Sequence, residues 1–480
     1  MKKALAAAVL AARAARVSLA PLASFASLAS LGAAGRAQAH GFDERYDLPV
    51  PLGLVVAAAC VVVALTFVAA TLFARRGATP HRSVAVIEVP LPQALLLALR
   101  ASAWLLCVLT IAAALWGSQD PLMNLAPTLV WIVWWVGLAF IAAAVDGVWA
   151  ALDPWRSSFQ MLDAAARRLG RPGGITLHLR WPTALGQWPA VALLLAWCWL
   201  EVVQPLASTP FKLGCAALAW TVCNVGGMVL FGLARWQAHA DVFALVFNTL
   251  GRLAPLRLRT VAPRPWQPVA GQVGFVMAML ASVVFDALHG SAAWQVFEEI
   301  LRRIAPRALD TNGLVAGTTG LLVVWLAFMS AYHITLRLSL ALMQRGGSGT
   351  QLASSLALTL LPIALAYNVA HNFSSLVIQG QRVFALLSDP FGWQWDLFGS
   401  ARWYPDIGLV DARLTWFVAV TAIVLGHAAS VWWSHRVVLA AGVPAQRAAL
   451  AMLPMTVLML GYTATSLLLI AEPMLTPVPP

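Results

Sequence analysis

Apolar stretches of about 18 residues or more recur along the whole chain, and they limit what it can fold into more than any other feature. A stretch of that length crosses a bilayer as an α-helix, which satisfies its own backbone hydrogen bonds. Of the 480 residues, 61% are hydrophobic and only 10% are charged, too few to cover a soluble protein of this size. The sequence therefore predicts an all-α fold, a polytopic membrane helix bundle.

The spacing of these stretches predicts about ten transmembrane helices and no soluble domain. We expect them at residues 52–74, 94–116, 127–150, 184–204, 213–234, 268–289, 314–336, 352–378, 413–434 and 449–471. The connections between them are short, except for 151–183, 235–267, 290–313 and 379–412. No internal repeat is evident.

The first 39 residues have the features of a bacterial secretory signal peptide. Two lysines precede a stretch rich in Ala, Leu and Ser, and residues 37–39 match an A-x-A cleavage site. We therefore expect a cleaved signal peptide, 1–39, and a ten-helix transmembrane domain, 40–480. The mature chain would begin at His40, outside the cytoplasm.

The distribution of arginines predicts the orientation of the helices. Connections expected on the cytoplasmic side carry more arginines than those expected outside, as the positive-inside rule requires. Because the arginines lie in short connections between apolar stretches, the formal net charge of +12 is explained by membrane orientation and does not indicate nucleic-acid binding. We expect a bacterial inner-membrane protein with both mature termini in the periplasm, the lipid bilayer as a partner and no nucleic acid.

One predicted helix carries an unusual stripe of polar residues. Within YNVAHNFSSLVIQGQ, at 367–381, helical spacing places five polar side chains on one side: Asn368, His371, Asn372, Ser375 and Gln379. Polar side chains at membrane depth normally face the bundle interior. His371 is therefore a candidate metal ligand or general base, or else it only packs through a hydrogen bond. Pro362 is expected to kink this helix.

Other titratable residues concentrate near the predicted outer ends of helices. Asp286 and His289 are three residues apart in VVFDALHG, and they could form a metal pair or a carboxylate-oriented imidazole. Glu201 lies at the end of another helix, in WLEVVQP. The simplest geometry is a polar cavity between helices that opens outward and has His371 at its floor. Solvated helix ends are the alternative interpretation of Asp286, His289 and Glu201.

Four segments of the chain resemble bacterial multipass membrane proteins of the fenitrothion hydrolase family. They are AHGFDERYDLPVPLGLVV at 39–56, AYNVAHNFSSLVIQGQ at 366–381, SDPFGWQWDLFG at 388–399 and LPMTVLMLGYTATSLLLIAEP at 453–473. The resemblance implies hydrolysis of organophosphorus triesters, in which a nitrophenol is split from a phosphorothioate. It also implies a second membrane subunit. It assigns no catalytic residue to any position of this chain.

Hydrolysis of such a triester requires an activated water molecule and a group that polarises the phosphoryl or thiophosphoryl bond. A divalent metal ion held by histidine and carboxylate ligands does both, so a metal is one possible cofactor. The candidate metal ligands are His289, His371, Asp286 and Glu201. The candidate catalytic residues are His371, Asn368 and Asn372, in which the asparagines orient the site or donate to the phosphoryl oxygen. The substrate would be an apolar small molecule.

Two other functional classes fit the same residues. A membrane transporter or channel would use a polar cavity lined by His and Asn. A metal- or haem-handling membrane subunit would use the histidines as ligands. The sequence contains no GxxxxGK[ST], HExxH or CxxCH motif, so it lacks the signatures of P-loop ATPases, zincins and covalent c-type haem. A structural subunit is the remaining alternative.

Overall fold

The computed structural model describes residues 51–73, 86–204, 209–259, 268–305, 313–343 and 349–471. The predicted signal peptide and His40 lie outside these residues. The chain divides into two compact units. In the described part of the chain, the first unit is built from residues 51–73, 276–305, 313–343, 349–373 and 411–471, and the second from 86–204, 209–259, 268–275 and 374–410.

The prediction of a polytopic membrane helix bundle is confirmed. In the described part of the chain, nine helical segments are long and apolar enough to cross a membrane: Leu52–Phe73, Gln93–Trp116, Leu125–Ala144, Pro210–Phe231, Gln272–His289, Leu314–Met343, Gly349–Ser388, Ala412–Ala440 and Ala445–Ala471. One of the ten predicted membrane helices, at 184–204, is instead a shorter apolar helix, Trp188–Val203.

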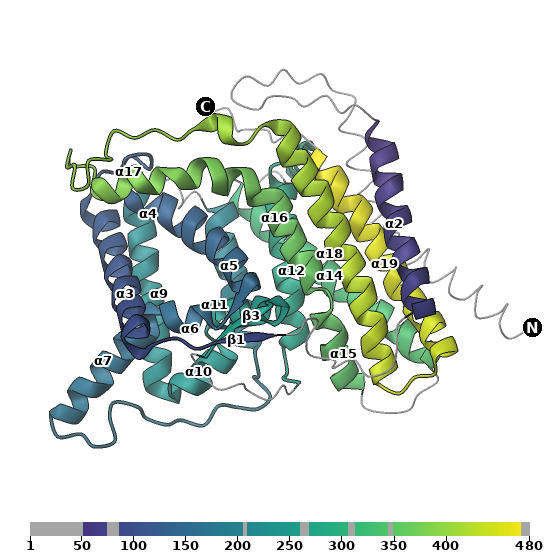
Figure 1. Ribbon diagram of the computed structural model, residues 1–480, viewed down its shortest axis with the longest axis horizontal. Helices are drawn as coiled ribbons and strands as arrows, with labels where there is room; N and C mark the ends of the chain where they lie inside the picture. The colour runs from purple at the N-terminus through teal and green to yellow at the C-terminus, as the bar shows by residue number, and fades with distance from the viewer. Residues whose placement is uncertain are drawn as a thin grey trace, which may run out of the picture. The chain divides into compact units, whose positions relative to one another are not determined.

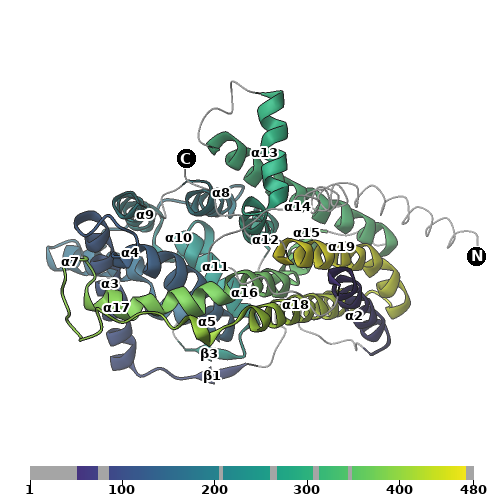
Figure 2. The ribbon, with the colours of Figure 1, turned by 90° about the horizontal axis from the view of Figure 1, so that it is seen from above.

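The first unit is a bundle of long helices. It contains α2 (Leu52–Phe73), α13 (Ala292–Ile304), α14 (Leu314–Met343), α15 (Gly349–Leu358), α18 (Ala412–Ala440) and α19 (Ala445–Ala471), with most of α12 (Gln272–His289) and α16 (Leu361–Ile378). The helices α2, α18 and α19 lie side by side in both views (Figure 1, Figure 2). The helix α14 packs against α19.

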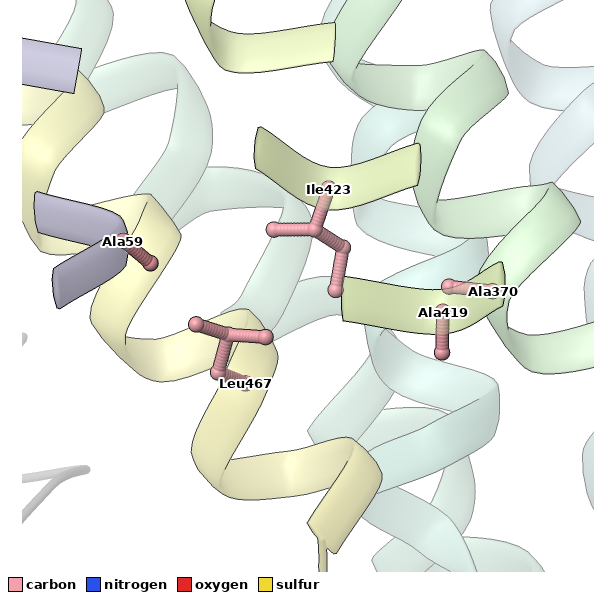
Figure 3. Close-up of a cluster of buried hydrophobic side chains, with 5 residues drawn as sticks. All are labelled: Ala59, Ala370, Ala419, Ile423 and Leu467. Carbon is pink, nitrogen blue, oxygen red and sulfur yellow. The ribbon is translucent and has the colours of Figure 1, made fainter. Parts of the chain in front are cut away.

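A buried apolar cluster joins four of these helices. Its members are Ala59 of α2, Ala370 of α16, Ala419 and Ile423 of α18, and Leu467 of α19 (Figure 3). Three of the five are alanines, whose small side chains let membrane helices approach closely. Because Ala370 immediately precedes His371, this packing also fixes the part of α16 that carries the histidine.

The predicted kink at Pro362 is instead a break between two helices. The segment 352–378 is divided into α15 and α16, and Pro362 is the second residue of α16. Proline is tolerated in the first turn of a helix because the N–H it lacks would have no partner there. The carbonyl of Thr359, at the break, accepts a hydrogen bond of 2.6 Å from Ser430 Oγ of α18.

The second unit consists mainly of shorter helices. Its α-helices are α3 (Gln93–Trp116), α4 (Leu125–Pro127), α5 (Leu138–Ala144), α6 (Val148–Leu152), α7 (Pro154–Arg168), α8 (Trp188–Cys198), α9 (Pro210–Phe231), α10 (Leu233–His239), α11 (Val242–Leu250) and α17 (Arg382–Ser388). Two π-helices, η1 (Thr128–Gly137) and η2 (Trp199–Val203), and three 3₁₀ turns, η3 (Gly251–Leu253), η4 (Gln379–Gln381) and η5 (Ile407–Leu409), complete it. The helices α3, α4 and α9 pack together (Figure 1).

The second unit also contains a small parallel sheet that the sequence did not predict. Its strands are β1 (Ile87–Val89), β2 (Val145–Asp146) and β3 (Leu256–Leu258), in the order β1-β3-β2. Arg257 of β3 lies with its Nε atom 3.0 Å from Asp146 Oδ2. The strand β3 and the helix α11 both lie in 235–267, the connection expected between two membrane helices.

Candidate functional site

His371 of α16 and Asp286 of α12 form a polar pair within the first unit. The Nε2 atom of His371 lies 3.0 Å from the Oδ2 atom of Asp286. The histidine side chain is only 9% exposed, whereas the aspartate side chain is 37% exposed. A hydrogen bond from Nε2–H to the carboxylate fixes the tautomer, which leaves Nδ1 free to accept a proton. The pair can therefore act as an oriented general base.

The helix α16 brings the two predicted catalytic asparagines close to this pair. Asn368 and Asn372 lie on α16 within about one turn of His371. The Oδ1 atom of Asn368 is buried and has no hydrogen-bond partner among the described residues. An amide oxygen in that position destabilises the fold unless another group donates to it. Asn372 is partly buried.

His289 does not join the pair. It ends α12 three residues after Asp286, and its ring lies against Trp294 of α13, with ring centroids 5.0 Å apart. The ring of Phe285 lies on the same histidine at 5.6 Å. Asp286 thus orients an imidazole, as one interpretation of the sequence held, but that imidazole belongs to His371 rather than to His289.

Glu201 lies in the second unit and contacts an indole. Its Oε2 atom accepts a hydrogen bond of 3.1 Å from Trp135 Nε1. Glu201 belongs to the π-helix η2 and Trp135 to the π-helix η1. Such helices are rare and occur frequently at functional sites. One carboxylate oxygen of Glu201 therefore has a hydrogen-bond donor within the second unit.

The predicted metal ligands lie in both units of the chain: His289, His371 and Asp286 in the first and Glu201 in the second. Among the described residues, no three His, Cys, Asp or Glu side chains are grouped so that they could hold a metal ion. His371 and Asp286 supply two donors, whereas metal sites in proteins commonly use three or four protein ligands. The predicted metal site of His289, His371, Asp286 and Glu201 therefore stays a prediction.

Two buried tyrosines of the first unit were missed in the sequence, and one of them lies beside the pair. The rings of Tyr367 and His371 are nearly parallel, at 28°, with centroids 6.5 Å apart. Tyr367 and Tyr462 line a cavity of about 70 Å³ whose other walls are mostly aliphatic. Both tyrosines occur inside apolar stretches rather than at helix ends, where tyrosine is enriched in membrane proteins. Their position inside apolar stretches was the sequence signal that could have identified these tyrosines.

A buried pair of carboxylates in the second unit was also missed. Asp153 caps the start of α7, and its Oδ2 atom accepts a hydrogen bond of 2.7 Å from Gln237 Nε2. Asp241 caps α11 through a 3.0 Å bond from Ala244 N, and its Oδ2 atom is buried without a partner in the described part of the chain. Burial raises the pKa of Asp153 to about 6. Burial and the nearby Asp153 raise the pKa of Asp241 well above its ordinary value.

These carboxylates predict a stability that falls with rising pH. A carboxyl group whose pKa is raised by folding stabilises the fold while it is protonated, and this stabilisation is lost as pH rises from about 4 through the folded-state pKa. Asp241→Asn keeps the helix cap but cannot ionise. We expect this variant to unfold at a higher temperature than the parent at pH 8, where the parent's buried carboxyl group would ionise, and at about the same temperature near pH 4.

Thermal unfolding followed by tryptophan fluorescence measures this difference. The control is Asp411→Asn, because Asp411 is also an N-cap, of α18, but is exposed. We expect the control to show no gain that depends on pH. A gain for Asp241→Asn that is equal at pH 4 and pH 8 would contradict the interpretation.

Comparisons with known proteins assign no function to the chain. No protein-family model, curated protein or solved structure matches it. The functional interpretation therefore depends on side-chain geometry, and above all on the pair of His371 and Asp286.

Proposed function

We propose that this chain is a membrane-embedded subunit of a hydrolase that acts on apolar organophosphorus triesters. The observation that carries the proposal is the 3.0 Å contact between His371 Nε2 and Asp286 Oδ2, two residues of segments long and apolar enough to cross a membrane. A histidine oriented by a carboxylate is the arrangement that general-base catalysis uses. The resemblance of four sequence segments to fenitrothion hydrolases supports the substrate class.

In the proposed reaction, a water molecule attacks phosphorus and gives a proton to Nδ1 of His371. A new bond forms between the water oxygen and phosphorus, and the bond from phosphorus to the aryl oxygen breaks. The nitrophenolate leaves with that electron pair. Asp286 remains ionised and stabilises the imidazolium that forms. Asn368 and Asn372 donate hydrogen bonds to the phosphoryl or thiophosphoryl group as its charge develops.

The cellular setting belongs to the same proposal. Apolar triesters partition into lipid, so a site among membrane helices can receive them from the bilayer. The bacterial inner membrane, periplasmic mature termini and a second membrane subunit follow from the signal-like N-terminus, the arginine distribution and the sequence resemblance. The nine apolar helical segments among the described residues agree with a multipass protein.

Nitrophenol release tests the reaction class. Washed membranes that contain this chain and the proposed second membrane subunit are incubated with an aryl dialkyl phosphorothioate. The absorbance of released nitrophenolate is followed over time. Membranes with the partner subunit alone serve as the control. We expect release that depends on this chain. Equal release from both preparations, with the chain correctly inserted, would overturn the proposal.

A transporter is the second candidate function, because of the break between α15 and α16. Interrupted membrane helices commonly bind substrates or ions in transporters, through their exposed backbone ends. Here the Ser430 hydroxyl already donates a hydrogen bond to the Thr359 carbonyl. It therefore occupies the position in which an ion would bind. This contact counts against an ion site at that carbonyl. Accumulation of intact, radiolabelled triester in proteoliposomes, without nitrophenol release, would favour the transporter instead.

A further inference from the structure

The helix α7 of the second unit starts beside the centres of two membrane-length helices. Trp104 Nε1 of α3 donates a 3.0 Å hydrogen bond to Ser158 Oγ of α7. Trp155 Nε1 of α7 donates another, also of 3.0 Å, to Thr221 Oγ1 of α9. Trp104 and Thr221 both lie close to the middle of their helices. From this level α7 projects away from α3 and α9, at the lower left of Figure 1.

The segment that follows α7 is fastened to the C-terminal end of α9. The backbone N–H groups of Leu177 and Leu179 donate hydrogen bonds of 2.8 and 2.9 Å to two carbonyls in the last turn of α9, which lack partners within their own helix. The N–H of Ile175 donates to Asp163 Oδ1 of α7, at 2.9 Å. Residues 163–180 are therefore held at the level where a membrane-length helix ends.

This part of the second unit carries a basic surface, formed by four exposed arginines: Arg167, Arg168, Arg171 and Arg180. Asp163 is the only acidic residue of the sequence between positions 154 and 187. It pairs with Arg167, whose Nε atom lies 2.9 Å from Asp163 Oδ2. The side chains of the other three arginines have no hydrogen-bond or ion-pair partner within the described residues. Three guanidinium groups are therefore available to an anionic partner.

Exposed leucines lie among these arginines. Leu169 is 85% exposed, and Leu177 and Leu179 are exposed as well. They stand next to arginines in the sequence, in RRLGR at 167–171 and in LHLR at 177–180. A dissolved anion would neutralise the arginines and leave the leucines in water. A lipid surface accommodates both, because the leucines enter the boundary of the acyl chains while the arginines reach the phosphate groups.

We propose that the basic surface binds the headgroups of anionic phospholipids where α9 leaves the membrane. Clusters of roughly four or more basic residues beside a membrane helix bind anionic lipids, and each arginine strengthens binding about fivefold. The hydrogen bonds to α9 and to Asp163 hold the backbone in place beforehand, so little order is lost on binding. The inference concerns the second unit and does not depend on hydrolysis.

Three soluble probes test the proposal on the full chain in a neutral detergent. Dioctanoyl phosphatidylglycerol has an anionic headgroup, dioctanoyl phosphatidylcholine has a zwitterionic one, and glycerol phosphate carries the anion without acyl chains. Each is titrated while the unfolding temperature is measured. We expect phosphatidylglycerol to raise this temperature more than phosphatidylcholine does, and by less when the ionic strength is raised from about 0.1 M to about 1 M. We expect glycerol phosphate at the same concentrations to leave it unchanged.

Substitutions of the three unpaired arginines locate the binding. We expect a variant that combines Arg168→Gln, Arg171→Gln and Arg180→Gln to weaken the apparent Kd of phosphatidylglycerol by about 10- to 100-fold, and to leave the response to phosphatidylcholine unchanged. Lysine at the same three positions keeps the charge. We expect that variant to bind within about threefold of the parent, which separates the loss of charge from damage to the fold.

The matched control removes three exposed arginines that already lie beside carboxylates. Arg302 and Arg303 pair with Glu299, and the charge of Arg402 acts on Asp396. We expect the control, with glutamine at these three arginines, to keep the affinity for phosphatidylglycerol within about twofold. Equal responses to the two lipids in the parent, or equal losses in the control and the test variant, would overturn the proposal. A response to glycerol phosphate as large as that to phosphatidylglycerol would also overturn it, because the surface would then bind free anions.

Discussion

His371→Ala is expected to reduce nitrophenol release by about 100- to 10,000-fold, the range that a general base contributes. The variant removes the imidazole that is proposed to take a proton from water. Asp286→Asn keeps a polar side chain beside the imidazole but no longer stabilises its charged form. We expect a smaller loss, of about 10- to 100-fold, as for other groups that orient a functional histidine. Initial rates at matched protein levels in washed membranes measure both effects.

His333→Ala is the matched control for these variants. His333 is a histidine of the same unit, on α14, but it is exposed, and its Nδ1 atom lies 2.7 Å from the carbonyl oxygen of Met329 in its own helix. We expect its removal to leave the rate within about twofold of the parent. If His333→Ala lost as much activity as His371→Ala, the losses would report general damage and not catalysis.

Gly426→Ala is expected to destabilise the first unit by about 1–3 kcal/mol. Gly426 lies where α18 crosses α16, and a methyl group there would overlap the side chain of Ala366 and lie 2.6 Å from the carbonyl oxygen of Pro362. Backbone atoms of a helix cannot move aside as a flexible side chain can. We therefore expect a lower unfolding temperature, and lower activity, because α16 also carries His371.

The control for this substitution is Gly226→Ala. Gly226 is also inside a membrane-length helix, α9, but a methyl group there would meet nothing within 4 Å. Replacing glycine by alanine in a helix is otherwise stabilising by roughly 0.5–1 kcal/mol, so the control should be as stable as the parent or more stable. An unchanged unfolding temperature for Gly426→Ala would show that the two helices do not cross as closely as described.

The sequence predicted the membrane helices well because their signal is local. A stretch such as Leu52–Phe73 contains no charge, and its length alone identifies it. Features that depend on contacts between distant segments of the chain, or on where a helix begins, were not predicted. Strand β3 has only three residues and pairs with segments distant in the chain, and the role of Pro362 depends on where a helix begins. Neither can be derived from hydropathy.

The candidate site was predicted in part. Helical spacing identified His371 with its asparagines, and charge within an apolar stretch identified Asp286. Their contact joins two helices, and periodicity within one helix contains no information about which neighbour it faces. The same limit explains why Asp286 was paired with His289, its neighbour in sequence, and why the buried Asp153 and Asp241 were missed.

A double-mutant cycle on His371 and Asp286 tests the central claim most directly. The rate of nitrophenol release is measured for His371→Ala, Asp286→Ala and the double variant, at matched levels of inserted protein. If the two side chains act as one unit, the double variant will be no slower than His371→Ala alone, within about twofold. If the two losses instead multiply, the residues act independently, and the paired general base is contradicted.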